Sequence, residues 1–244
     1  EEPTRLVFTY TRYFHIGMQM NPEAGSVLFV GGGGFSGPKN FLVTYPNAIV
    51  DVVEIDRDVI ETAQRYFEVE VNPRLTVFNV DARVHLTQSD RLYDLIVLDA
   101  YAKTYVPFHL MTLEFMELLA SRLTPEGIVV SNLIGSLVGD TSDLVRAEYK
   151  TISSVFPNVA VFTTTEAGIG AVQNLIVVFT KSAKVPIAQQ LESISGEVAN
   201  EIPTASEYAR HAHSESIPVE DVPLLTDGYA PVESLLNPVT ARPY

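Results

Sequence analysis

Four consecutive glycines, Gly31 to Gly34, follow an apolar run that ends at Val30. Glycine lets a backbone approach a ligand closely and adopt positive φ, and the N-terminus of a following helix offers free N–H groups. Glu54 lies 23 residues after Gly31 (54 − 31), near the end of the next apolar run. A carboxylate there can accept hydrogen bonds from both hydroxyls of a ribose. A glycine-rich turn is a weak signal by itself, but the two features in this order predict a nucleoside site.

The glycine spacing distinguishes between classes of nucleotide. A pyrophosphate-binding G-x-G-x-x-G motif that begins at Gly31 and Gly33 would end at position 36, where this chain has Ser36. The missing glycine favours a nucleoside without phosphates, such as an S-adenosyl compound. Asp81, in the segment NVDAR, follows a third apolar run. Its carboxylate either accepts from an adenine amine or caps the helix that follows, and the two roles are compatible.

Another acid ends the fourth apolar run, YDLIVLDAY. Asp99 follows it directly, so it should lie at the carboxyl edge of the sheet, where open α/β folds bind ligands. A carboxylate at this edge must find a cation or a hydrogen-bond donor, because burial otherwise raises its pKa. Asp99 therefore either contacts a cationic substrate or caps a loop. Asp94, at the beginning of the same run, should lie at the opposite edge and serve the fold.

The elements that position these acids alternate between β-rich apolar runs and helical patterns, which is typical of βαβ units around a parallel sheet. We expect strands at 26–30, 49–55, 75–80, 95–98, 127–133, 159–163 and 174–180, and helices at 38–45, 58–67, 110–123 and 144–156. The predicted fold class is α/β: a doubly wound, mostly parallel seven-stranded sheet, Rossmann-like and of the S-adenosylmethionine methyltransferase type. The predicted strand order is 3-2-1-4-5-7-6, with the last strand antiparallel and the ligand crevice above strands one and four.

The chain is expected to divide into three segments. Residues 1–25 are a remnant N-terminal segment leading into the core, and 26–183 form the nucleoside-binding domain. Residues 184–244 hold two helix-like pieces, at 186–199 and 204–213, and a tail punctuated by proline. We expect this last segment to be a helical and coil cap, packed on the same domain.

Composition narrows the classes of partner. The net charge is −14, from 30 acidic against 16 basic residues. This disfavours nucleic acid, whose affinity depends on Lys and Arg, and favours a small cationic substrate, although an acidic surface also serves solubility. The absence of cysteine excludes disulfides, thiolate metal sites and a Cys nucleophile. The five histidines show no metal-ligand spacing with acids, so no metal is expected.

The sequence says less about the cellular location of the protein. A chain without cysteine fits a reducing compartment, so we expect a cytoplasmic location. No apolar run reaches 18 residues. The first residue is Glu rather than Met, which leaves room for a membrane segment or a further domain ahead of residue 1.

Several segments together resemble the spermidine synthase family of polyamine aminopropyltransferases, and more closely its shorter or membrane-fused prokaryotic branch. They are VLFVGGGG, VVEIDRDVIETAQRYF, VDAR, YDLIVLDAY, VPFHLMTLEFMELLASRLTPEGIVVSN and the tail segment LLTDGYAPVE. The resemblance implies that decarboxylated S-adenosylmethionine, or S-adenosylmethionine, is a co-substrate, with no covalently bound cofactor. The implied nucleoside contacts are Gly31, Gly33, Glu54, Asp81 and Ala82. In this resemblance Asp99 helps to deprotonate the attacking amine, Tyr10 lines the amine site, and the protein is a homodimer.

Two carboxylates of the family pattern are missing. The family reads G-G-G-D-G-G, and that Asp grips the aminopropyl ammonium, whereas this chain has Gly34. The family also reads D-x-x-D-P after strand four, where this chain has Ala102 and Lys103. The family's N-terminal β-hairpin is also mostly absent. Specificity for a decarboxylated donor and a polyamine acceptor therefore does not follow from the resemblance.

The candidate substrate contacts are Tyr101 and, in the tail, Asp227 and Tyr229. The tail residues compensate for the missing acids if the tail folds over the pocket, whereas an Asp-Gly pair between prolines is otherwise a plain turn. Three functions stay open. The first is aminopropyl transfer to an amine, releasing methylthioadenosine. The second is S-adenosylmethionine-dependent methylation of a small molecule, favoured by Gly34. The third is a non-catalytic nucleoside-binding domain.

Overall fold

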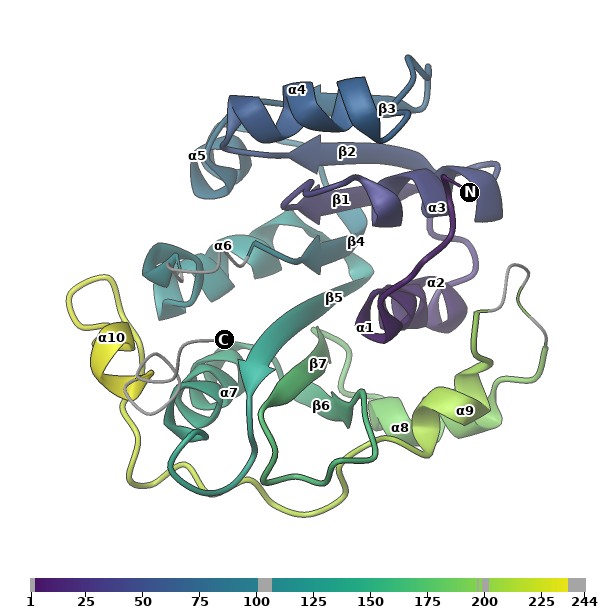
Figure 1. Ribbon diagram of the computed structural model, residues 1–244. Coiled ribbons are helices and arrows are strands. Elements are labelled where there is room, and N and C mark those ends of the chain that lie inside the picture. The colour runs from purple at the N-terminus through teal and green to yellow at the C-terminus, as the bar shows by residue number, and fades with distance from the viewer. Residues whose placement is uncertain (1–2, 101–106, 197, 199–201, 237–244) are drawn as a thin grey trace.

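A single seven-stranded sheet forms the centre of the computed structural model, which describes residues 3–100, 107–196, 198 and 202–236 (Figure 1). The strand order is β3-β2-β1-β4-β5-β7-β6, which confirms the predicted order. β1 to β5 are parallel, and β7 lies antiparallel between β5 and β6, as expected. The strands are β1 (Ser26–Val30), β2 (Ile49–Val53), β3 (Leu75–Phe78), β4 (Tyr93–Leu98), β5 (Leu123–Gly135), β6 (Asn158–Thr163) and β7 (Gln173–Thr180).

Helices cover both faces of the sheet (Figure 1). One face packs against α1 (Thr9–Arg12), η1 (Tyr13–His15), α2 (Ile16–Met20), α3 (Ser36–Thr44), α4 (Arg57–Tyr66), α8 (Ile187–Ser193) and α9 (Ala205–Ala209). The other face packs against α5 (Ala82–Gln88), α6 (Leu113–Arg122) and α7 (Asp143–Val155). The described elements also include η2 (Phe108–Leu110) and α10 (Val232–Leu235). Alternating strand residues feed these two cores, which is the pattern of a parallel sheet buried on both sides.

The N-terminal segment is part of the core. The sequence pattern did not predict the three short helices over residues 9–20. Tyr13, Phe14 and Ile16 are almost completely buried in the apolar cluster under β1 and β4. Removing this segment would therefore expose the first face of the sheet.

Two boundaries differ clearly from the predicted ones. α6 begins at Leu113 rather than at residue 110, because the Thr112 side chain caps it by accepting a hydrogen bond from the Phe115 N–H (3.4 Å). β5 runs from Leu123 to Gly135, beyond the predicted 127–133. It begins earlier, at Leu123, which pairs with Tyr93 of β4, and it ends later because pairing with β7 continues to Gly135 opposite Gln173.

The two C-terminal helices are shorter than the predicted 186–199 and 204–213. α9 begins with a capping box between Thr204 and Glu207 and ends at Ala209. After it, the backbone of His211 accepts a hydrogen bond from the Thr163 N–H (3.1 Å), and the His213 N–H donates to the Val161 carbonyl (2.8 Å). The chain therefore extends along the edge strand β6 instead of continuing as a helix, which satisfies backbone groups that an edge strand would otherwise leave open.

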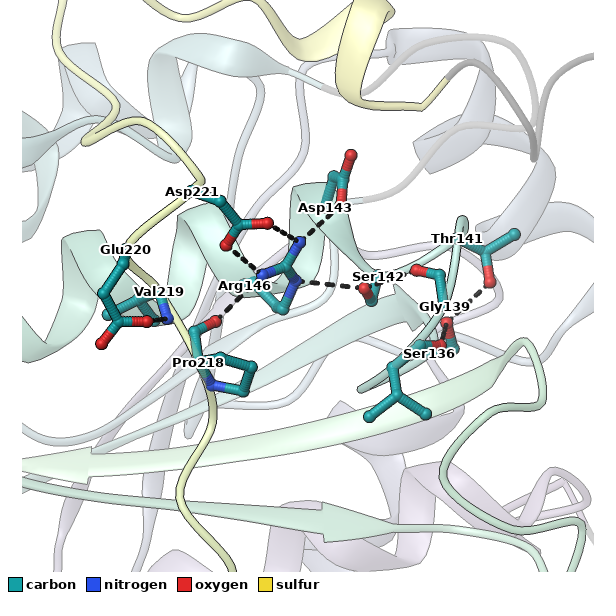
Figure 2. Close-up of polar contacts among 11 residues, drawn as sticks. Ser136, Gly139, Thr141, Ser142, Asp143, Arg146, Pro218, Val219, Glu220 and Asp221 are labelled. Atoms are coloured by element: carbon teal, nitrogen blue, oxygen red, sulfur yellow. Dashed lines mark hydrogen bonds and ion pairs between the residues drawn. The ribbon is translucent and has the colours of Figure 1, made fainter.

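The C-terminal tail is fastened to α7 through a buried arginine (Figure 2). The Arg146 guanidinium forms two hydrogen bonds with the carboxylate of Asp221 in the tail. It also donates to the Asp143 carboxylate (2.7 Å), to the Pro218 carbonyl (3.1 Å) and to the Ser142 hydroxyl (3.1 Å). These contacts raise the pKa of Arg146 further above its usual range, chiefly through the Asp221 hydrogen bond. The charge that folding removes from water is thus fully paired, and the tail has a fixed path across α7.

Candidate active site

The glycine-rich turn lies directly beside the end of β4. Gly31 has a φ of 97°, and a Cβ at this position would lie 2.3 Å from the backbone carbonyl oxygen of Asp99. The Gly31 N–H donates to the Val53 carbonyl, and the Asp99 N–H donates to the Val30 carbonyl, both at 2.9 Å. Only glycine satisfies both the positive φ and the close approach. The turn and Asp99 are consequently held together at the carboxyl edge of the sheet, as the sequence predicted.

The residue that follows the four glycines has a left-handed backbone conformation although it is not a glycine. Phe35, the residue before α3, has a φ of 56° and is completely buried in the first core. A bulky side chain in this region of φ costs on the order of 1–3 kcal/mol, so the surrounding packing must hold it. Gly34 differs, because its φ is not positive and a Cβ there would meet Phe67 at 3.5 Å, an ordinary contact. Position 34 therefore has room for a side chain.

Glu54 contacts the glycine-rich turn. Its Oε2 accepts the Gly32 N–H (2.9 Å), and its Oε1 accepts the Asp56 N–H (3.0 Å). The side chain is half-exposed at the end of β2. These bonds orient the carboxylate toward the same edge as the turn, where it retains lone pairs for further donors such as ribose hydroxyls.

Asp81 has the helix-capping role that the sequence allowed. Its Oδ1 accepts the Val84 N–H (3.0 Å), so it caps α5, of which Ala82 is the first residue. Its Oδ2 lies 2.8 Å from Nε2 of His109. Burial raises the pKa of Asp81, but the bonds from Val84 and His109 outweigh that effect and hold the pKa below its usual range. A base that binds Asp81 must therefore share this carboxylate with His109, a contact that no sequence spacing indicated.

Asp99 is joined to side chains from remote parts of the chain. Its Oδ2 accepts the hydroxyl of Tyr10 from α1 (3.3 Å), and its Oδ1 accepts the amide of Asn132 from β5 (2.8 Å). Burial raises the pKa of Asp99, and these two bonds limit the rise. The pKa of Tyr10 is raised as well, by burial and by the nearby carboxylate, so its hydroxyl stays a donor. The structure thus brings together two of the sequence-predicted site residues, Tyr10 and Asp99.

The tail residue Asp227 is paired with an arginine, and Tyr229 lies in the same turn. The Asp227 carboxylate forms two hydrogen bonds with the Arg83 guanidinium and accepts the Thr112 hydroxyl (2.8 Å). These bonds lower its pKa, chiefly through Arg83. Its charge is therefore neutralised by Arg83, and Tyr229 is 61% exposed in the adjoining turn. Tyr101, Ala102 and Lys103 lie outside the described residues.

The sequence did not indicate three polar residues near these acids. They are His109, Asn132 and the β7 residue Asn174, whose amide donates to the Asn132 side-chain oxygen (2.9 Å). Asn132 ends the segment GIVVSN, where Ser131 separates it from the apolar run, whereas Asp99 follows its apolar run directly. Spacing in the sequence therefore did not relate the two residues, and their proximity comes from the pairing of Leu98 with Ser131.

A cavity of about 30 Å³, roughly the size of one water molecule, lies at the carboxyl ends of β1, β4 and β5, between Val30, Leu98 and Ser131. In the part of the chain that the structure describes, no helix is long and apolar enough to cross a membrane. Nor do three or more His, Asp or Glu side chains gather there in an arrangement that could hold a metal ion.

Comparison with known proteins places this geometry in a family. A family model described as the spermine/spermidine synthase domain matches residues 7–189. A polyamine aminopropyltransferase of Vibrio vulnificus is 36% identical over 155 residues, which cover 62% of this chain and 50% of that protein. A probable spermidine synthase from Corynebacterium glutamicum has a solved structure that aligns with a TM-score of 0.65 at 22% identity, over 91% of this chain and 85% of that chain. Human methyltransferase-like protein 13, in complex with SAH, aligns with a TM-score of 0.64 at 22% identity, over 80% of this chain and 97% of that chain.

The fold is therefore a Rossmann-like α/β domain of the S-adenosylmethionine methyltransferase type, as predicted. Since the family model covers well over half of the sequence, the chain belongs to the spermine/spermidine synthase family. This confirms the resemblance carried by the motifs. The chain spans half the length of the Vibrio relative that it matches.

Proposed function

We propose that this chain transfers an aminopropyl group from decarboxylated S-adenosylmethionine to an amine, releasing methylthioadenosine. The observation that carries the proposal is Asp99, which lies beside the Gly31 turn and is held there by Tyr10 and Asn132. This is the position in which a carboxylate can receive a proton from an amine while the donor binds along the glycine-rich turn.

The reaction needs few groups from the protein. An aliphatic amine, with a pKa of about 10.4, is protonated at neutral pH and becomes a nucleophile only when it loses that proton. Asp99 accepts the proton, directly or through water. The amine nitrogen then attacks the carbon next to the sulfonium. A C–N bond forms and the C–S bond breaks, with its electron pair going to sulfur, so that methylthioadenosine leaves as a neutral thioether. The donor carries its own leaving group, so positioning and proton acceptance are the contributions required.

The nucleoside half of the site is assigned to residues that are already oriented. Glu54 would receive the ribose hydroxyls, and the Gly31–Gly33 backbone would lie against the nucleoside. Asp81 would accept from the adenine amine beside Ala82. The raised pKa of Asp99 and the lowered pKa of Asp81 fit this division, since one acid must take up a proton and the other must stay ionised.

Methyl transfer from S-adenosylmethionine is the second candidate. The observation that favours it is Gly34, where the family pattern places the acid that binds the donor's ammonium. We further propose a small cationic amine as acceptor, a homodimer and a cytoplasmic location. The dimer follows from the family resemblance and is tested by light scattering.

Product analysis separates the candidates. The chain is incubated with each donor and a panel of linear diamines, and the nucleoside product is identified by mass spectrometry. Methylthioadenosine supports aminopropyl transfer, and S-adenosylhomocysteine supports methyl transfer. Binding of both donors without either product supports a non-catalytic domain.

A further inference from the structure

We propose that Asn174 is a positioning residue for Asp99, and that it acts through Asn132 in an amide relay that runs from β7 to β4. This inference rests on the proposed role of Asp99 as the proton acceptor. No motif pointed to Asn174, which belongs to the antiparallel strand at the far side of β5.

The strand register places the three side chains in a row. Leu98 of β4 pairs with Ser131 of β5, so the residues that follow each, Asp99 and Asn132, are neighbours. Asn132 pairs with Ile176 of β7, and Asn174 lies two residues from that partner on the same face. Such diagonal neighbours are within reach of each other's side chains.

The hydrogen bonds follow this row. Asn174 Nδ2 donates to Asn132 Oδ1 (2.9 Å), and Asn132 Nδ2 donates to Asp99 Oδ1 (2.8 Å). Asn132 is buried, at 2% exposure, so water does not supply an alternative partner. The Asn132 amide therefore has one fixed direction, because the Asp99 carboxylate only accepts, whereas Asn174 is partly exposed.

The orientation of the Asn132 amide affects whether the charge of the Asp99 carboxylate is stabilised. An amide has a donor end and an acceptor end of nearly equal size. With its NH₂ toward Asp99, it stabilises the carboxylate; with its oxygen there, it repels the charge. Because Asn174 presents an NH₂ to the oxygen of Asn132, it supports the stabilising orientation, in which the NH₂ of Asn132 faces Asp99.

The groups that face Asp99 come from α1, the glycine-rich turn, β5 and β7. From α1 the titratable group facing Asp99 is the Tyr10 hydroxyl, and from the glycine-rich turn the backbone faces it. From β5 and β7 the facing groups are the two neutral amides. Among the described residues, burial raises the pKa of Asp99, and the bonds from Asn132 and Tyr10 oppose the rise. The Asn132 bond thereby lowers the pH above which Asp99 is a base.

Two substitutions at Asn174 test the relay. In Asn174→Asp the new carboxylate only accepts, so it competes with Asp99 for the NH₂ of Asn132 and also adds a negative charge nearby. Asn174→Leu removes the partner without adding charge and leaves Asn132 free to rotate. Both variants should raise the pKa of Asp99, the aspartate variant more, by about one pH unit or above.

The control is Asn158→Asp, the same change on β6. Asn158 donates to the carbonyls of Ser182 (3.1 Å) and Val185 (2.7 Å), and its β7 partner is Thr180, at the other end of the strand from Asn174. It should change stability but leave the titration of Asp99 unaltered.

The first measurement is a ¹³C NMR titration of the Asp99 carboxyl, which does not depend on turnover. A raised pKa in both Asn174 variants and an unchanged one in Asn158→Asp supports the relay. An unchanged pKa in folded Asn174→Leu, or an equal shift in the control, overturns it. If Asn174→Asp does not fold, Asn174→Leu decides.

The second measurement is the pH profile of kcat/KM with the donor that is turned over. Its acidic limb should move to higher pH by the shift seen in NMR, with an approximately tenfold lower rate on that limb for a one-unit shift. If the pKa measured by NMR shifts but the pH profile does not, the relay stands and Asp99 is not the proton acceptor.

Discussion

The two halves of the site are built differently. In the nucleoside half, Glu54 and Asp81 are partly exposed and accept mainly backbone N–H groups, of which the farthest is that of Gly32, 22 residues from Glu54. In the amine half, Asp99 is joined to Tyr10 and Asn132, which lie 89 and 33 residues away. The nucleoside half keeps the family's residues, whereas the amine half lacks the acids at positions 34 and 102. The proposed nucleoside half is thus oriented mainly by backbone donors, and the proposed amine half by side chains from remote segments.

Among these substitutions, Asp99→Asn should have the largest effect on turnover, because it changes the amine half of the site. Asparagine keeps the shape and can still accept from Asn132, but it cannot take up the proton. We expect turnover to fall roughly 10²–10⁴-fold, the usual range for general acid–base catalysis. Affinity for methylthioadenosine should hardly change in calorimetry. A folded variant with normal turnover would show that the amine half does not act through Asp99.

Glu54→Gln tests the other half. Glutamine provides one acceptor oxygen where the carboxylate serves both Gly32 and Asp56, so a nucleoside hydroxyl or a backbone N–H loses its partner. We expect methylthioadenosine affinity to weaken by about 1–3 kcal/mol in calorimetry. Glu61→Gln, in an exposed pair with Arg57 on α4, is the matched control and should bind normally. Equal affinity in the two variants would remove Glu54 from the ribose role.

Gly34→Asp restores one of the two missing acids and tests whether its absence limits the affinity for the donor. A side chain fits there without a positive φ, and its nearest neighbour is Phe67 at 3.5 Å. We expect affinity for decarboxylated S-adenosylmethionine to rise about tenfold, as a new charge-assisted hydrogen bond would produce. Gly34→Asn, which has the same shape without the charge, should show no such gain. A gain in both variants would assign the effect to packing.

The stability of the two halves should depend on pH in opposite directions. The pKa of Asp81 is lowered in the folded protein, so its contribution is present above the unfolded pKa and is lost as pH falls through the folded value. The pKa of Asp99 is raised, so its ionisation destabilises the fold at neutral pH, and that cost disappears on acidification. Asp99→Asn should therefore be more stable than the native chain at pH 7 in urea unfolding. That advantage should shrink toward pH 4, and an advantage independent of pH would contradict this account.

The sheet, the glycine-rich turn and the helix cap at Asp81 were predictable from the sequence. Hydrophobic runs separated by helical patterns were enough for the strand order, because parallel βαβ units allow few topologies. Gly31 and Glu54 were recognisable because their roles depend on backbone geometry and on spacing along neighbouring strands. The cap at Asp81 is equally local, since a helix N-cap contacts N–H groups three residues ahead.

The partners of Asp99 and of Asp227 could be identified only in the folded structure. Asn132 contacts Asp99 because β4 and β5 pair in the sheet, and Asn174 contacts Asn132 because β5 and β7 are adjacent. Tyr10 reaches Asp99 from α1 in the N-terminal segment. The partner of Asp227 is Arg83, which is 144 residues away in the sequence and donates two hydrogen bonds to its carboxylate. Side-chain pairs of this kind depend on distances between remote segments, which periodicity and spacing along one chain do not encode.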